Sequence, residues 1–317
     1  MDTFDWRLLK VLHETHNITK ASQSLYLSQP TLTKRLQQIE SEFETELFVR
    51  HSRGITFTPK GLLLVEKATQ ILNEYEELKD RLNSFTNSDV TGTLRIAANA
   101  PFARGELPFL VSRFHELYPN VQFDIHTDYS ERNYYKLCNG ELPLGFIREN
   151  YSWPHHKLLI KEEKIYIISR DPFHLEDLKN MNEIHSRFSL RLFAQLEQWW
   201  SSHFDIPLQS FITVEDSSIA VEYVKRGLGF TILPDIVIYN RKNEFYRLPL
   251  IDAQNQYITR QTWLYYRDKS LENPVVQLFI SFMEQYQGAN SQSPNSAAPP
   301  GDIYTAYKDT LPPASIK

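Results

Sequence analysis

Residues 28–35, SQPTLTKR, place several hydrogen-bonding side chains at the predicted start of a short helix. Ser28 is a good N-cap residue, and Pro30 suits the first turn, where a missing backbone N–H does little harm. The side chains that we expect to face outward are Gln29, Thr31, Thr33, Lys34 and Arg35. Glutamine can read adenine, a threonine methyl can contact a thymine methyl, and lysine or arginine can bind guanine or phosphate. The segment therefore predicts a helix whose N-terminal end enters the major groove of DNA.

Two apolar patterns would position this helix. Before it, Thr19 is a good N-cap for a first short helix, whose apolar spacing is given by Ala21, Leu25 and Leu27. Within the second helix, apolar side chains recur every three or four residues and should form a buried stripe: Leu32, Leu36, Ile39 and Phe43. The two patterns predict a helix-turn-helix.

A hairpin should follow these helices. Residues 47–49 indicate a strand, Ser52, Arg53 and Gly54 a turn, and residues 55–58 the returning strand. Such a wing would carry Arg50, His51 and Arg53 toward the DNA backbone or the minor groove.

Charge alone does not identify this segment as a DNA-binding domain. The whole chain has a net charge of -5 and a pI near 6.1, and helix-turn-helix shapes also occur as packing motifs. Residues 1–60 hold eight Lys or Arg against seven Asp or Glu. The positive groups, however, gather around residues 34–35 and 50–60, whereas the acids at 40–46 form a separate block. The segment is polarised rather than basic.

The order of these residues resembles a known family. SQPTLTKRLQQIE followed by ELFVRHSRGITFTPKG resembles the winged helix-turn-helix of the LysR-type transcriptional regulators, with Thr31 and Thr33 in place of smaller residues more usual there. The matching positions are Ser28, Gln29, Pro30, Leu32, Leu47, Phe48, Arg50, Thr58 and Gly61. The resemblance implies a regulator that binds a palindromic double-stranded DNA site, self-associates as a dimer or tetramer, contacts RNA polymerase and responds to a small-molecule effector. The DNA-binding residues expected on these grounds are Thr19, Ser28, Gln29, Pro30, Thr31, Thr33, Lys34, Arg35, Arg50, Arg53 and Thr58.

A long helix should come next. Thr58 caps it and Pro59 opens it, and residues 59 to about 86 predict one helix of about 40 Å. Its apolar positions alternate at four and three residues: Leu64, Ala68, Ile71, Tyr75, Leu78, Leu82 and Phe85. This spacing is typical of a coiled-coil seam, although a stripe that packs on its own domain is the alternative. The polar residues 88–92 mark a hinge.

From Thr93 onward, short strands alternate with helices, which predicts an α/β module with a largely parallel sheet. LRIAA, FHELYPNVQFDI, GELPLGFI and RGLGFTILP resemble the two-lobed effector-binding domain of the same family, which is similar to periplasmic solute-binding proteins. The expected boundaries are 1–58 for the winged domain, mainly α, 59–87 for the linker helix, 88–287 for the effector-binding domain and 288–317 for a disordered tail. Lobe I would take residues 92–161 and 267–287, and lobe II residues 162–266.

Polar side chains follow several predicted strands of this module. Ligands of open α/β sheets lie beyond the carboxyl ends of strands, where helix N-termini supply free N–H groups. The candidate effector-binding residues are Asn99, Ala100, Pro101, Thr127, Asp128, Arg148, Ser217, Ser218 and Thr231. Converging N–H groups favour a small organic anion, with Arg148 as the counter-charge. Each of these residues also has an ordinary reading as a helix cap or a solvated side chain.

Other functions find little support. No run approaches 18 apolar residues and the N-terminus carries early acids, so neither a membrane span nor a secretion signal is expected, and we expect a cytoplasmic protein. The lone cysteine, Cys138, excludes a two-cysteine switch within one chain and should be a small core residue.

Enzyme motifs such as GxSxG, HExxH, a P-loop or CxxC are absent, so no cofactor or metal is expected. His155 and His156 cannot both face one metal from a strand, and Trp199 and Trp200 should lie in the core. Two rivals stay open: a constitutive DNA-binding protein whose α/β module only oligomerises, and an enzyme fused to a DNA-binding domain.

Overall fold

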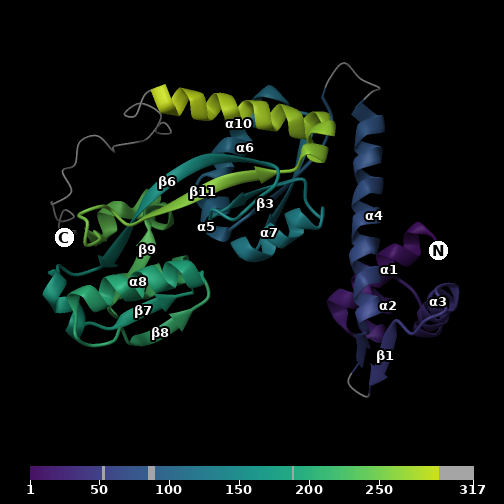
Figure 1. Cartoon of the computed structure of the whole chain (residues 1–317), viewed down its shortest axis with the longest axis horizontal. Coiled ribbons are helices and arrows are strands. Elements are labelled where there is room, and N and C mark those ends of the chain that lie inside the picture. The colour runs from purple at the N-terminus through teal and green to yellow at the C-terminus, as the bar shows by residue number, and fades with distance from the viewer. Residues whose placement is uncertain (52–53, 85–89, 188, 293–317) are drawn as a thin grey trace.

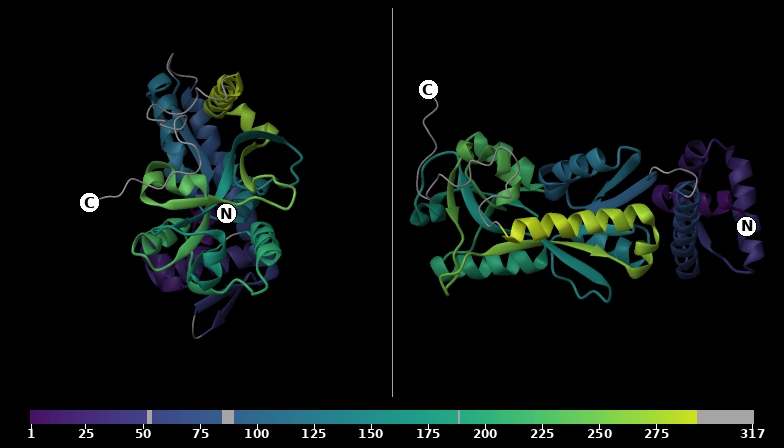
Figure 2. Two further views of the ribbon diagram at one scale, coloured as in Figure 1. Left: turned by 90° about the vertical axis from the view of Figure 1, so that its left-hand side faces the viewer. Right: turned by 90° about the horizontal axis from the view of Figure 1, so that it is seen from above.

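The computed structural model describes residues 1–51, 54–84, 90–187 and 189–292. The chain forms a small N-terminal domain, a long helix and a larger two-lobed module (Figure 1). In the view from above, lobe II, lobe I and the N-terminal domain follow one another along the long axis (Figure 2). No helix among the described residues is both long and apolar enough to cross a membrane.

The N-terminal domain is the predicted winged helix-turn-helix. It consists of α1 (Thr3–Thr15), α2 (Ile18–Ser24), α3 (Gln29–Glu42) and the antiparallel pair β1 (Phe48–His51) and β2 (Gly54–Phe57). Its core holds Leu8, Leu9, Leu12, Ala21, Leu32, Leu36 and Ile39. Phe43 was predicted to complete the buried stripe, but it is the C-cap of α3 and is 43% exposed. The tip of the wing, residues 52–53, lies outside the described residues.

The linker helix α4 (Pro59–Ser84) follows directly, and the Thr58 hydroxyl accepts the N–H of Gly61 at 3.1 Å as its cap. The first half of the apolar stripe serves the winged domain, because Ala68 is fully buried there. Along the second half exposure rises, from 39% at Ile71 to 51% at Leu78 and 58% at Leu82. The first part of the stripe therefore packs within the winged domain, and the second part forms an uncovered apolar face. Phe85 and residues 88–89 of the predicted hinge lie outside the described residues, and Gly92 already opens β3.

One mixed sheet runs through both lobes, in the order β4-β3-β5-β11-β6-β9-β7-β8, with β10 also paired to β6. Its strands are β3 (Gly92–Ala98), β4 (Val121–Thr127), β5 (Leu144–Ile147), β6 (His156–Ser169), β7 (Glu183–Ser186), β8 (Ser210–Val214), β9 (Phe230–Pro234), β10 (Tyr246–Pro249) and β11 (Thr259–Tyr266). Among the described strands of this sheet four pairings are parallel and four antiparallel. The expectation of a largely parallel sheet was wrong, because β6 and β11 cross between the lobes and run antiparallel to their neighbours.

The two crossing strands also move a predicted lobe boundary. β6 pairs with β11 through residues 156–164 and with β9 and β10 through residues 165–169, so its crossing lies close to the predicted 161/162. The second crossing was expected at 266/267. Residues 263–266 of β11, however, pair with β5 and belong to lobe I, which places the crossing near 259–262.

Helices cover both faces of lobe I. The helices of the module are α5 (Ala100–Gly105), α6 (Leu107–Leu117), α7 (Ser130–Cys138), α8 (Leu190–His203), α9 (Ser217–Lys225) and α10 (Pro274–Gln292), with 3-10 turns η1 (Leu175–Asn180), η2 (Asp235–Glu244) and η3 (Asp268–Glu272). α6 and α10 pack on one face of β3 around Phe114 and Phe279, whereas α7 packs Leu137 against Ala97 on the other (Figure 1).

Lobe II has its own core. α8 was not anticipated, although Leu192, Leu196 and Trp199 recur at helical spacing and are buried. Trp200 packs beside them on Phe230, as expected of core tryptophans. α10 ends at Gln292, so the first five residues of the predicted tail are helical, and residues 293–317 lie outside the described part of the chain.

The uncovered face of α4 gives a first prediction. Leu78→Lys puts a charge in the middle of this face and should reduce the sedimenting mass, because an apolar four-and-three seam is stable when a second helix buries it. Leu63→Lys is the matched control, since Leu63 lies on α4 outside the seam and is 57% exposed. An unchanged mass for Leu78→Lys would mean that the seam does not pair subunits.

Candidate DNA interface and effector cleft

The N-terminal end of α3 presents polar groups to solvent, as the sequence predicts. Ser28 caps the helix by accepting the N–H of Thr31 at 3.3 Å, and the two hydroxyls lie 2.7 Å apart. Pro30 occupies the first turn. Gln29, Thr31 and Lys34 are exposed, whereas Thr33 is half-buried. The first turn of α3 can therefore reach base edges without rearrangement.

Thr19 has a different place from the predicted one. The N-cap of α2 is Asn17, whose side-chain oxygen accepts the N–H of Lys20 at 3.0 Å. Thr19 lies in the first turn of α2 with an exposed side chain, and its carbonyl accepts the hydroxyl of Ser22. Asparagine caps as well as threonine, so the sequence pattern alone did not fix the position.

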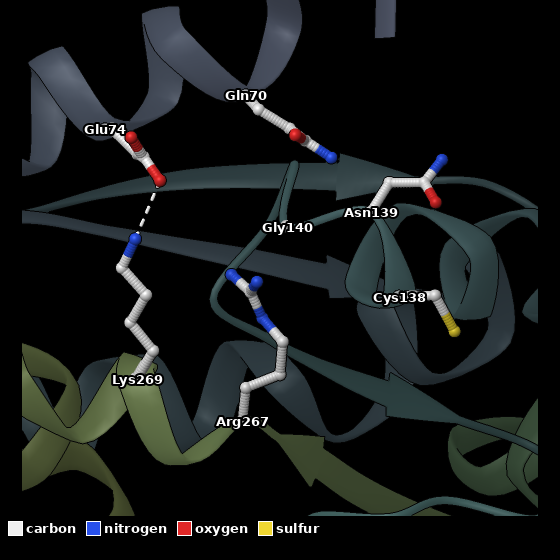
Figure 3. Close-up of a pocket in the computed structure, with 7 residues that line it drawn as sticks. All are labelled: Gln70, Glu74, Cys138, Asn139, Gly140, Arg267 and Lys269. Carbon is white, nitrogen blue, oxygen red and sulfur yellow. Dashed lines mark hydrogen bonds and ion pairs between the residues drawn. The ribbon is translucent and has the colours of Figure 1, made fainter. Parts of the chain in front are cut away.

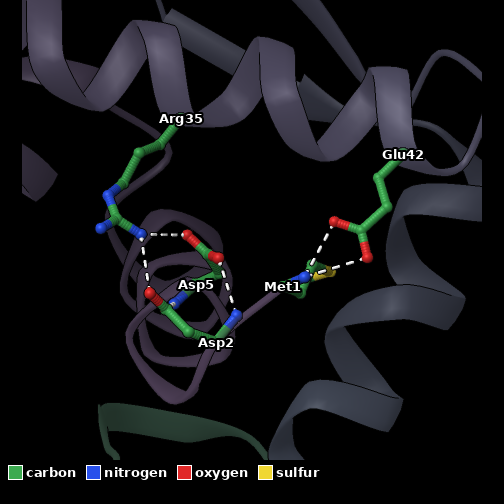
Figure 4. A network of polar contacts seen from close by, with 5 residues as sticks. All are labelled: Met1, Asp2, Asp5, Arg35 and Glu42. Atoms are coloured by element: carbon green, nitrogen blue, oxygen red, sulfur yellow. Dashed lines mark hydrogen bonds and ion pairs between the residues drawn. The ribbon is translucent and has the colours of Figure 1, made fainter.

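Arg35 does not face outward freely. Its guanidinium donates to Asp5 at 2.6 Å and reaches Asp2 at 3.4 Å (Figure 4). It also lies 4.9 Å from the centre of the Phe4 ring. The hydrogen bond to Asp5 raises the pKa of Arg35 despite partial burial. Arg35 thus ties α3 to the start of α1, which contradicts its expected role as a free groove-facing cation.

Two further expected DNA-binding residues, Arg50 and Thr58, differ in how free their side chains are. Arg50 is exposed on β1, opposite Ile55 of β2, and can reach a phosphate. Arg53 lies outside the described residues. The Thr58 hydroxyl donates to the carbonyl of Glu46 at 3.0 Å while it caps α4. Because both of its hydrogen-bonding functions are used internally, Thr58 is a helix cap rather than a free DNA contact.

Three expected effector residues meet at the carboxyl edge of lobe I. Asn99 follows β3, Asp128 follows β4 and Arg148 follows β5, and these strands are neighbours. Asn99 caps α5 by accepting the N–H of Phe102 at 3.1 Å, and its buried Nδ2 has no partner among the described residues. Burial opposes ionisation of Asp128, but hydrogen bonds from Lys136 and the Tyr129 N–H lower its pKa. Ala100 and Pro101 open α5, and Thr127 ends β4.

Arg148 forms a buried ion pair with Glu163 at the crossing between the lobes. The second oxygen of Glu163 accepts the N–H of Ile236 at 2.8 Å. Burial raises the pKa of Glu163 although Arg148 faces it. The carboxylate therefore joins an arginine of lobe I to the backbone of lobe II, and Arg148 is not a free counter-charge as expected.

A second arginine at the crossing was missed from the sequence, and its Nε is buried although the side chain as a whole is 13% exposed. Arg260 lies on β11 opposite Glu163, and its nearest carboxylate oxygen, on Glu149, is 3.4 Å away. Burial and then the charge of Arg148 lower the pKa of Arg260 to about 10. The Nε of Arg260 and the Nε of Arg148 are both buried and have no acceptor in the described part of the chain. An arginine inside the strand TRQTWLYY was the signal available in the sequence.

Lobe II contributes the N-terminal end of α9. Asp216 is the N-cap and accepts the N–H of Ser218 at 2.7 Å, while Ser217 is half-buried in the first turn. The Ser218 hydroxyl also donates to Asp216, so it is less available than predicted. Thr231 is fully buried and pairs with Ile168 of β6. Ile168 lies three residues along β6 from Ile165, the residue of this pairing that is nearest to the crossing. Three residues of strand span about 10 Å, which places Thr231 inside the sheet rather than at the cleft edge.

Polar contacts join the lobes where β4 and β8 end. The Tyr129 hydroxyl donates to Glu215 at 2.6 Å, and Arg104 lies 3.6 Å from Asp216. The hydrogen bond to Glu215 raises the pKa of Tyr129. A ligand that enters between the lobes must break or bypass these contacts.

A cavity of about 170 Å³ lies elsewhere, between α4 and lobe I. Gln70 and Glu74 of α4 face Asn139, Arg267 and Lys269 across it, and Lys269 pairs with Glu74 at 2.7 Å (Figure 3). Cys138 lines this cavity and is exposed, so its expected place in the core was wrong.

The adjacent histidines were expected to be unable to face one point together, but they share one partner, because His155 precedes β6. His155 and His156 both contact Asp268, at 2.8 and 2.6 Å. Within the ranges that the structure describes, no cluster of three His, Cys, Asp or Glu side chains could hold a metal ion.

Comparison with known proteins covers nearly all of this architecture. Residues 4–62 match the family model of the bacterial regulatory helix-turn-helix proteins, lysR family, and residues 87–288 match the LysR substrate binding domain. YraN of Bacillus subtilis, an uncharacterized HTH-type transcriptional regulator, is 34% identical over 287 residues, which are 90% of this chain and 99% of YraN. GltR of the same organism is 28% identical over 277 residues, 85% of this chain and 92% of GltR.

Solved structures show the same fold. CbnR, a LysR family transcriptional regulator, superposes with a TM-score of 0.67 at 19% identity, covering 90% of this chain and 99% of that chain. Full-length CbnR complexed with its target DNA gives a TM-score of 0.66 at 19% identity, with the same coverage.

The buried pair at the crossing gives a second prediction. Glu163→Gln leaves the Arg148 charge buried without its partner and should lower the free energy of unfolding by about 3 kcal/mol. Chemical denaturation monitored by tryptophan fluorescence measures this change in the free energy of unfolding. Glu162→Gln, an exposed neighbour on the same strand, is the control and should change stability little. Equal stability of the two variants would show that the ion pair does not hold the lobes together.

Proposed function

We propose how this chain, which belongs to the LysR family of bacterial transcriptional regulators, acts on DNA. It is accordingly a DNA-binding regulator with a C-terminal effector-binding domain. The first turn of α3 reads the operator, and the exposed side chains of Gln29, Thr31 and Lys34 support this role. Gln29 contacts a base edge, whereas Lys34 and Arg50 contact phosphates and set the register.

Two subunits bind one interrupted palindrome. The exposed seam on α4 supports pairing, since Ile71, Tyr75, Leu78 and Leu82 form an apolar face that the described part of the subunit leaves largely uncovered. Paired winged domains then meet two half-sites at a fixed spacing. We infer that dimers associate further into tetramers, that the protein acts in the cytoplasm on promoter DNA, and that it contacts RNA polymerase there without catalysing a reaction.

The effector is a small organic anion bound between the lobes. The observation that carries this proposal is the chemistry of the unpaired buried groups at the crossing and the lobe I edge. The Nδ2 of Asn99 and the Nε atoms of Arg148 and Arg260 are all hydrogen-bond donors without an acceptor in the described part of the chain. Buried donors favour a ligand that brings acceptors, and a carboxylate brings two.

The charges at the crossing limit the net charge of this anion. Two guanidinium groups, Arg148 and Arg260, face two carboxylates, Glu149 and Glu163. Because these four charges already balance, a monocarboxylate that displaces Glu149 from its 3.4 Å contact with Arg260 suits the site better than a highly charged anion. Ser217 in the first turn of α9 supplies contacts from lobe II, so occupation changes how the lobes sit together.

Base reading gives a third prediction. Gln29→Ala should lose discrimination at one or two base pairs by about 1 to 3 kcal/mol, because the side chain is expected to read a base edge. Lys34→Ala should weaken all site variants alike and reduce the salt slope of binding by about 1. Fluorescence anisotropy on a set of single-base variants at two salt concentrations separates the two. If Gln29→Ala keeps the relative affinities of the wild type, its contact is with the backbone.

The effector site gives a fourth prediction. Asn99→Ala combined with Ser217→Ala should abolish the response to an anion and leave basal DNA binding unchanged, because the winged domain has a core of its own. Calorimetry with mono- and dicarboxylates, sugars and amines identifies the ligand class, and a ligand of the native state must also raise Tm with concentration.

The matched control for this pair is Asn120→Ala with Ser201→Ala, two exposed positions away from the crossing. Binding of only neutral or cationic compounds would contradict the anion. The absence of a Tm shift with every compound would favour the constitutive alternative, in which the α/β module only oligomerises.

A further inference from the structure

Tyr26 occupies the turn between α2 and α3 in a conformation that tyrosine rarely adopts. Its φ is +54°, in the left-handed region. The N–H of Tyr26 bonds to the carbonyl of Gln23 at 3.2 Å, and the N–H of Leu27 bonds to the carbonyl of Ser22 at 2.9 Å. This pair of bonds is the Schellman arrangement at the C-terminal end of α2, with Tyr26 in the position usually held by glycine or asparagine.

The tyrosine ring buries almost no surface on folding, so it adds little to the stability of the subunit. The residue is 96% exposed, the highest value among the exposed large hydrophobic side chains of the described chain. A left-handed backbone strains any residue that carries a Cβ, and a bulky one more than asparagine. A strained position filled by a large side chain without packing contacts points to a contact made outside the subunit.

The position of Tyr26 identifies that contact. It lies two residues before Ser28, the N-cap of α3, and its Cα is at most about 11 Å from that of Gln29, because three peptide units separate them. Thr19 and Lys20 at the start of α2 are exposed near the same helix pair. A tyrosine hydroxyl is a good donor to phosphate, and its ring can cover a deoxyribose.

We propose that Tyr26 is a DNA-binding residue that packs on the sugar–phosphate backbone beside the groove entered by α3, with its hydroxyl donating to a phosphate. The inference rests on DNA binding by the winged domain. It adds a sequence-independent contact that fixes the register of α3 on the duplex. The left-handed turn holds the ring out from the protein surface, toward the bound strand.

Tyr26→Asn tests the proposal, because asparagine tolerates the left-handed turn and removes the ring. We expect Tm to stay equal or rise, and affinity for the operator to fall by about three- to tenfold. The loss should be the same for all single-base variants, since backbone contacts carry no sequence information. Tyr26→Phe should give part of the loss, which measures the hydroxyl separately.

Glu44→Asp is the matched control. Glu44 occupies the same Schellman position at the other end of α3, with φ +48° and the bonds Glu44 N–H to Ser41 and Thr45 N–H to Glu40. This variant reduces the backbone strain in the same kind of left-handed turn and keeps the negative charge, so it should bind DNA like the wild type. Wild-type binding verifies the DNA-binding premise independently. Unchanged affinity in Tyr26→Asn, an altered order of base preference, or a fall in Tm that accompanies the loss would each overturn the proposal.

Discussion

The linker helix α4 joins the winged domain to lobe I without a break. Its first half is part of the winged-domain core through Val65 and Ala68. Its second half docks on lobe I, where Asn73 donates to the carbonyls of Gly140 and Glu141 at 3.3 and 3.0 Å and Glu74 pairs with Lys269. A helix without internal proline transmits orientation as a rigid rod of about 39 Å. The direction of α3 is thereby linked to the face of lobe I that carries residues 139–141 and 267–269.

The second determining feature is the set of charges where β6 and β11 cross between the lobes. A buried ion pair with one partner removed is strongly destabilising, so Arg148 and Glu163 hold the crossing in one arrangement. Arg260 beside them lacks an equally close carboxylate. The crossing therefore combines a buried ion pair with buried donors that have no acceptor in the described part of the chain, and we propose that the ligand binds there.

Local signals in the sequence were sufficient for much of this architecture. Caps at Ser28, Thr58 and Asn99 lie where hydrogen-bonding side chains precede helices, and the stripe of α3 follows from its spacing. The predictions that were wrong or missing concern residues whose contacts are with residues distant in sequence. Arg35 is held by Asp5 thirty residues away, and the place of Arg260 depends on its register with Glu163. Thr231 was misplaced because a strand pattern gives no depth within a sheet, and Cys138 because the last turn of α7 faces a cavity.

We propose that two copies of this chain bind DNA through α3 and respond to an anion held between the lobes. Hydroxyl-radical footprinting of the full-length protein on the DNA flanking its own gene tests both parts of this proposal. We expect two protected half-sites on one face of the duplex, separated by about one helical turn or a multiple of it. We also expect the protection to change when a carboxylate that raises Tm is added. A single protected half-site, or a pattern indifferent to every carboxylate that binds, would contradict it.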